Sequence, residues 1–108
     1  MTVEYLKTKA EYDAAIAAST DKLLVIDFTA SWCPPCKMIA PKFEAMAAEN
    51  TDVVFKKIDV DENSEAAQAA GIQAMPTFKF YKGGAELTGA MVQGANEQKI
   101  KDAVAANK

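Results

Sequence analysis

The chain contains two cysteines, and they stand three positions apart in the segment SWCPPCKM, residues 31–38. Two prolines are the only residues between Cys33 and Cys36. A pair this close is compatible with four kinds of chemistry: a reactive thiol–disulfide pair, half of a metal site, a structural disulfide, or two unrelated buried thiols. The rest of the sequence has to distinguish among these four.

Composition narrows the class of protein. A length of 108 residues is enough for one domain, and we expect a single domain over residues 1–108. Half of the residues are hydrophobic and a quarter are charged, which is ordinary for a globular protein. The net charge of -3 offers no basic surface for nucleic acid or an anionic membrane. No apolar run approaches the roughly 20 residues of a membrane-spanning helix.

The first residues, MTVEYLKTKAEYD, have neither a basic segment nor an apolar core, so no signal peptide is predicted. We therefore expect a cytoplasmic protein. In a reducing cytosol a permanent structural disulfide is rare, and a close cysteine pair more often does redox or metal chemistry. A zinc site needs about four nitrogen or sulfur ligands, whereas this chain has two thiols and no histidine. We therefore do not expect a metal site.

Several segments have the pattern of strands. Residues 22–30, KLLVIDFTA, form an almost continuous apolar run, which is typical of a strand covered on both faces. Residues 52–60, DVVFKKIDV, have the same character. Residues 76–94 predict a β-hairpin with its turn at Gly83–Gly84. A further strand near residues 3–6 has the weakest pattern.

Four helices are predicted between and after these strands. The tetrapeptide TKAE, residues 8–11, is a capping box, and the helix that it starts should end at about Ala18. The segment after the cysteines has helical periodicity, and Pro41 should kink it. SEAAQAAG, residues 64–71, predicts a short helix, and Asn96 is the expected N-cap of the last one. The order β-α-β-α-β-α-β-β-α implies an α/β fold with a mixed sheet between helices.

The cysteine pair lies where a buried strand gives way to a helix. If Cys33 is the N-cap, Pro34 and Pro35 occupy the first two helical positions, where proline is tolerated. An N-cap side chain normally accepts a hydrogen bond from the second or third amide of the helix. Because both prolines lack an N–H, the Cys36 amide is the nearest donor left for the Cys33 sulfur. That bond and the positive helix end favour thiolate over thiol, so Cys33 is the predicted nucleophile.

Cys36 lies one turn further along and should be the more buried sulfur. It can attack a mixed disulfide formed at Cys33, which requires that it lose a proton first. Asp27 interrupts the apolar strand before the cysteines, and burial would raise its pKa into a range that suits a general base. Alternatively, Asp27 is a strand residue satisfied by a local hydrogen bond. Lys57 in the neighbouring strand is a candidate ionic partner for Asp27, or a solvated lysine.

Four stretches of the chain resemble the thioredoxin family, in the same order and across nearly the whole length. They are VIDFTASWCPPCKMIAPKF, FKKIDVDEN, AMPTFKFYKGG and GAN. The most specific element is Trp-Cys-x-Pro-Cys-Lys after an Asp-containing strand, followed some forty residues on by Met-Pro-Thr. The chain is similar to eukaryotic cytosolic thioredoxins, and the h-type proteins of plants and algae are the nearest comparison. The resemblance implies the thioredoxin fold: a central mixed sheet of about five strands with four flanking helices.

The resemblance also implies a function, a thiol–disulfide oxidoreductase that reduces disulfides in partner proteins. Cys33 would attack, Cys36 would resolve, Asp27 would accept a proton, and Lys57 would lie beside Asp27. Electrons would come from NADPH through thioredoxin reductase, with no cofactor bound to this chain. Pro76 would be cis and opposite the disulfide. The implied docking residues for target proteins are Trp32, Pro34, Pro35, Ala74, Met75, Pro76, Gly94 and Ala95.

The chain departs from the commonest family pattern at the spacer, where Pro34 replaces glycine. That variant occurs among h-type members, and the sign of its effect on the reduction potential stays open. The alternative function, from a different class, is a binding or chaperone module of the same fold whose thiols are not catalytic. In either case we expect a monomer that binds neither nucleic acid nor membrane.

Overall fold

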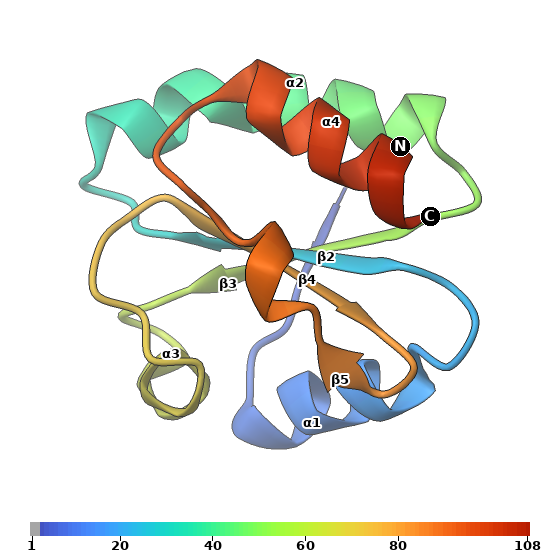
Figure 1. Ribbon diagram of the computed structural model, residues 1–108. Coiled ribbons are helices and arrows are strands. Elements are labelled where there is room, and N and C mark those ends of the chain that lie inside the picture. Colours follow the sequence, from blue (N-terminus) through green and yellow to red (C-terminus); the bar gives the residue numbers. More distant parts are fainter. Residues whose placement is uncertain (1–2) are drawn as a thin grey trace.

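The computed structural model describes residues 3–108, which fold into a central sheet between two layers of helices (Figure 1). Helices α2 (Pro34–Glu49) and α4 (Glu97–Asn107) cover one face of the sheet. Helices α1 (Lys9–Ala18) and α3 (Ser64–Ala69) cover the other face. Within the described residues, every helix falls short of the length and apolarity that crossing a bilayer demands.

The described residues form six strands in one mixed sheet, with the order β1-β3-β2-β4-β5. Strands β1, β3 and β2 run parallel to one another, and β4 is antiparallel to β2, β5 and β6. The strands are β1 (Glu4–Tyr5), β2 (Leu24–Thr29), β3 (Val54–Asp59), β4 (Thr77–Lys82), β5 (Ala85–Glu86) and β6 (Val92–Gln93). The predicted fold class, thioredoxin-like and α/β, is therefore confirmed.

The central strand β2 is buried on both faces, as its unbroken apolar sequence predicts. Successive side chains of a strand point to opposite faces. Val25 lies in the apolar cluster under α2 and α4, whereas Leu24 and Ile26 lie in the cluster over α1 and α3. Asp27 is in phase with Val25, so its carboxyl group points toward α2. On β3 the same alternation places Lys57 on this face.

The second arm of the hairpin that begins at Thr77 differs from the sequence prediction. Its turn is at Gly83 and Gly84 as predicted, and both have positive φ, at 69° and 76°. The returning arm, however, is interrupted by a 3₁₀ turn over Thr88–Ala90 between β5 and β6. This stretch consists of small residues around a glycine, which form strands poorly. The sheet consequently has two short strands in place of one long arm.

The helix boundaries agree with the capping residues identified in the sequence. Thr8 accepts a hydrogen bond from the Glu11 amide at 3.1 Å, and Asn96 accepts one from the Lys99 amide at 3.0 Å. Both bonds satisfy amides that have no partner inside the helix. Helix α2 is continuous through Pro41, and the predicted kink at that residue stays a prediction.

Replacement of Asn96 by alanine should lower the free energy of unfolding by about 1 kcal/mol, because the Lys99 amide loses its acceptor. Urea unfolding followed by circular dichroism measures this change. Gln98→Ala is the matched control, since Gln98 is an exposed residue of the same first turn. It should cost less than about 0.5 kcal/mol. Equal losses in both variants would contradict the capping role of Asn96.

Candidate active site

The site is built where β2 ends and α2 begins. Cys33 is the N-cap of α2, with extended backbone angles, φ −97° and ψ 108°, and prolines fill the next two positions. The Cys36 amide donates a hydrogen bond to the Cys33 Sγ at 3.3 Å. The geometry predicted from the spacing is therefore confirmed. A sulfur in this position faces the positive end of a 16-residue helix.

The two cysteines form a disulfide, with their Cα atoms 5.2 Å apart. Both residues are buried, Cys33 at 4% and Cys36 at 2% relative exposure, so Cys36 is the more buried of the two by a small margin, as predicted. They pack with Ala30, Val60 and Met75 in a small apolar cluster of their own. Within residues 3–108, no group of three or more potential ligand side chains is arranged to hold a metal ion.

The loop before β4 lies against the disulfide. The Met75–Pro76 peptide is cis, as the family resemblance implies, and the Met75 carbonyl oxygen is 3.8 Å from the Cys33 Sγ. Gly94 reaches this loop through its amide, which donates to the Pro76 carbonyl at 2.8 Å. Ala95 packs at the margin of the main core. The fold thus brings two segments that are distant in sequence to the same side of the cysteine pair.

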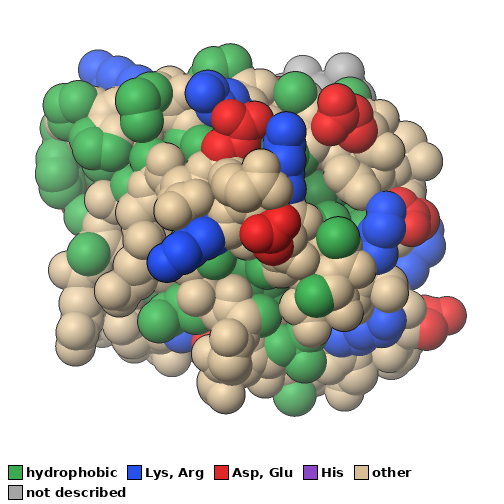
Figure 2. All heavy atoms as spheres, turned by 45° about the horizontal axis from the view of Figure 1, so that its top comes forward, with side chains coloured by type: hydrophobic (Ala, Val, Ile, Leu, Met, Phe, Trp, Pro, Cys, Tyr) green, Lys and Arg blue, Asp and Glu red, His purple; other side chains and the backbone are tan. Residues whose placement is uncertain are grey.

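An apolar surface surrounds the start of α2. Trp32 is 61% exposed, and its indole N–H donates to the Asp61 carboxylate at 2.8 Å, a bond that the sequence did not predict. Pro34, Pro35 and Ala74 are also exposed. In Figure 2, hydrophobic side chains gather at the upper left, the end of the molecule at which α2 begins. Exposed apolar side chains thus lie beside the disulfide.

Asp27 is buried directly behind the cysteines. Its relative exposure is 1%, and neither carboxylate oxygen has a hydrogen-bond partner among the described residues. The alternative in which Asp27 is satisfied by a local hydrogen bond is therefore wrong. Burial raises the pKa of Asp27 from 3.8 to about 7, and the positive charge of Lys57 opposes that rise.

Lys57 pairs in register with Asp27 across β2 and β3, yet its ammonium group is bonded elsewhere. The Lys57 Nζ is 3.4 Å from a carboxylate oxygen of Glu44 on α2, and it lies 5.6 Å from the centre of the Tyr5 ring. Neither alternative considered for Lys57 describes it fully: its ion pair is with Glu44 and not with Asp27, and its side chain is only 12% exposed. Glu44 was missed because a lone glutamate on a helix usually faces solvent.

One cavity has both Asp27 and Cys36 in its wall. It has a volume of about 250 Å³, and its lining includes Asp27, Cys36, Lys57 and Thr29. A space of this size, with several polar groups in its wall, has room for water molecules. Asp27 and Cys36 thus border the same space.

Comparison with known proteins agrees with this geometry. The thioredoxin family model matches residues 3–106. A thioredoxin of the sponge Geodia cydonium is 58% identical over 106 residues, which cover 98% of this chain and 99% of that protein. Thioredoxin-2 of Saccharomyces cerevisiae is 54% identical over 105 residues, which cover 97% of this chain and 98% of the yeast protein.

Solved structures give the same result. The structure of Fasciola hepatica thioredoxin superposes with a TM-score of 0.93 at 43% identity, covering 98% of this chain and all of the other. Thioredoxin NaTrxh from Nicotiana alata superposes with a TM-score of 0.91 at 41% identity, covering 98% of this chain and 92% of the other. These relatives span animals, yeast and plants, so they support a eukaryotic thioredoxin without singling out the h-type. The chain belongs to the thioredoxin family and is a thiol–disulfide oxidoreductase that acts as a protein-disulfide reductase.

Proposed function

We propose that Cys33 is the attacking cysteine of this reductase and Cys36 the resolving one. The observation that carries this order is the hydrogen bond from the Cys36 amide to the Cys33 Sγ at the first turn of α2. The bond and the helix end both stabilise the thiolate, which is the nucleophilic form of cysteine. Cys36 receives no such support, because it lies inside the helix.

In the first step, the Cys33 thiolate attacks one sulfur of a target disulfide. A bond forms between Cys33 and that sulfur, the target's own S–S bond breaks, and its second sulfur leaves as a thiolate. The Met75 backbone lies 3.8 Å from the attacking sulfur. An extended target segment could pair with this backbone in the manner of an added strand, which would align its disulfide with Cys33.

In the second step, Cys36 loses its proton and attacks the Cys33 sulfur. The Cys33–target bond breaks, the reduced target leaves, and the Cys33–Cys36 disulfide remains. Asp27 accepts the Cys36 proton through the cavity that both residues line. With a pKa raised to about 7, Asp27 can take up and release a proton near neutral pH. Lys57 limits how far burial raises that pKa.

The exposed apolar surface around the cysteines is the proposed docking surface for target proteins. Its apolar character and its backbone groups suit many extended segments, since pairing through the backbone does not depend on the target's sequence. Trp32 and the two spacer prolines are exposed, whereas Pro76 is buried and acts by shaping the loop. The residues of this docking surface are Trp32, Pro34, Pro35, Ala74, Met75, Pro76, Gly94 and Ala95.

We also propose that NADPH supplies the electrons through a thioredoxin reductase, and that the chain works in the cytoplasm as a monomer. Family membership supports a reductase partner and disulfide-containing targets. One structural neighbour, 32% identical with a TM-score of 0.89, is described in a study of thiol resolution in a yeast mitochondrial 1-Cys peroxiredoxin. Peroxiredoxins are accordingly one class of target to test.

Replacement of Asp27 by asparagine should stabilise the oxidised protein at high pH. Because burial raises the pKa of Asp27 from 3.8 to about 7, ionisation destabilises the folded state progressively between pH 4 and pH 7. The penalty is complete above that range and absent below it. The variant should gain up to about 4 kcal/mol at pH 8, at 1.36 kcal/mol per pKa unit, and nothing at pH 4.

Urea unfolding of the wild type and the Asp27→Asn variant at several pH values measures this gain. Asp52→Asn is the matched control, because Asp52 is exposed. Its stability should stay within about 0.5 kcal/mol of the wild type at every pH. A gain in Asp27→Asn that is the same at pH 4 and pH 8 would show that folding does not raise the pKa of Asp27.

The order of attack predicts which variant traps target proteins. Cys36→Ser keeps the nucleophile and removes the resolving thiol, so covalent complexes with a disulfide-containing target should accumulate. Cys33→Ser is the matched control and should give none. Non-reducing gel electrophoresis with insulin as the target separates the two outcomes. Complexes formed by Cys33→Ser in place of Cys36→Ser would reverse the assignment, and a function that survives Cys33→Ser although insulin reduction is lost would favour the binding-module alternative.

A further inference from the structure

We propose that Glu44 is a positioning residue for proton transfer: it binds the Lys57 ammonium group and thereby keeps that charge from pairing with Asp27. The inference rests on the proposed role of Asp27 as the proton acceptor of Cys36. It adds a third charged residue to the pair that the sequence pointed to. Glu44 acts through Lys57 and does not touch the reacting sulfurs.

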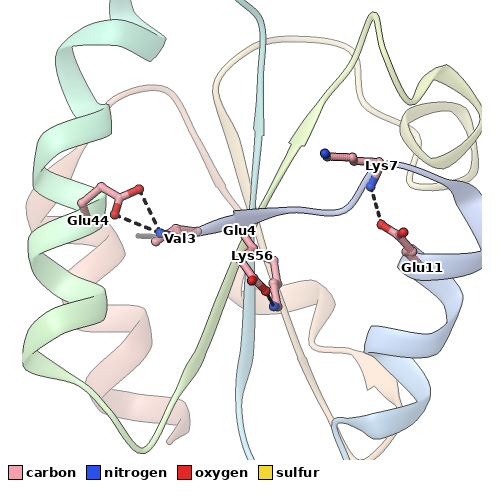
Figure 3. Close-up of polar contacts among 6 residues, drawn as sticks. All are labelled: Val3, Glu4, Lys7, Glu11, Glu44 and Lys56. Carbon is pink, nitrogen blue, oxygen red and sulfur yellow. Dashed lines mark hydrogen bonds and ion pairs between the residues drawn. The ribbon is translucent and has the colours of Figure 1, made fainter. Parts of the chain in front are cut away.

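The Glu44 carboxylate has two partners. It accepts the Val3 amide with both oxygens, at 2.9 and 3.2 Å, so that it reaches from α2 to the residue before β1 (Figure 3). One of these oxygens is also 3.4 Å from the Lys57 Nζ. The Glu44 side chain is 29% exposed and that of Lys57 is 12% exposed. A carboxylate with these contacts is held in place and cannot follow the lysine if it moves.

Lys57 is placed where it could serve either carboxylate. Its register partner on β2 is Asp27, and strand alternation directs both side chains toward α2. Glu44 and the Tyr5 ring hold the ammonium group together, the ring at 5.6 Å from the Nζ. The Asp27 oxygens have no hydrogen-bond partner among the described residues. The lysine is therefore bonded to the more exposed of two available carboxylates.

The other groups around Asp27 do not replace Lys57 in this role. The register partner on β4 is Phe78, which is apolar. Lys37 is exposed on the first turn of α2. The titratable groups that line the cavity together with Asp27 in the oxidised protein are Tyr5 of β1, Lys37 of α2, and Lys57 and Asp59 of β3. Of the two cations in this set, Lys57 is the less exposed, and it alone shares a register position with Asp27.

The consequence is a carboxyl group that keeps its proton to higher pH. A neighbouring ammonium group favours the charged form of a carboxylate, and the effect grows as the pair comes together in a buried site. With the ammonium group bound to Glu44, Asp27 receives only part of that stabilisation. Removal of the Glu44 charge should free Lys57 to approach Asp27 and lower the pH at which Asp27 ionises.

Carbon-13 NMR of the Asp27 carboxyl group in the oxidised protein tests this directly. Glu44→Gln keeps the side chain's size and an acceptor for the Val3 amide, and it removes the charge. The Asp27 titration midpoint should fall by at least about 0.5 pH unit. In the Lys57→Met background, the same Glu44→Gln change should shift the midpoint by less than half as much, since no ammonium group remains to be released.

Glu49→Gln, which removes a charge from the exposed last turn of α2, is the matched control and should leave the midpoint unchanged. No shift in Glu44→Gln would overturn the proposal, and so would an equal shift with and without Lys57. Should Glu44→Gln fold poorly, Lys57→Met alone decides: its midpoint should rise, and an unchanged midpoint refutes the coupling. The experiment measures a titration and involves no turnover. A negative result would therefore refute the role of Glu44 and leave the order of attack, which the trapping experiment tests, unaffected.

Discussion

The site depends on one hydrogen bond at the start of α2, from the Cys36 amide to the Cys33 Sγ. Pro34 and Pro35 have no amide hydrogen, so the Cys36 amide is the first backbone N–H of the helix that can donate to the sulfur. The strand that precedes it and the helix that follows hold the N-cap in place. In the proposed mechanism, this backbone geometry selects Cys33 as the nucleophile.

The burial of Asp27 costs the fold stability. A buried carboxyl group without hydrogen-bond partners destabilises the folded state once it ionises. The same burial raises its pKa to about 7, where a group can exchange protons at neutral pH. The surrounding sheet tolerates this cost because the other residues of β2 from Leu24 to Phe28 are apolar and buried.

The sequence was sufficient to predict the elements and the cysteine geometry, because caps, prolines and apolar runs are local signals. It was not sufficient for the long-range polar contacts. The contacts of Glu44 with Lys57 and the Val3 amide join a helix to β3 and to the residue before β1, and the two charged residues look solvated when taken one at a time. The Trp32–Asp61 bond was missed for the same reason. The interrupted arm of the hairpin was missed because strand pairing depends on partners distant in sequence.

The most direct test of the central claim is the rate at which iodoacetamide alkylates Cys33 in the reduced protein, measured from pH 5 to pH 10. Mass spectrometry of the peptides assigns the modified thiol to Cys33 or Cys36. Because the Cys36 amide and the helix end stabilise the Cys33 thiolate, the rate should reach half of its maximum at least about one pH unit below the value of 8.5 for free cysteine. A midpoint for Cys33 at about 8.5 would contradict its assignment as the activated nucleophile.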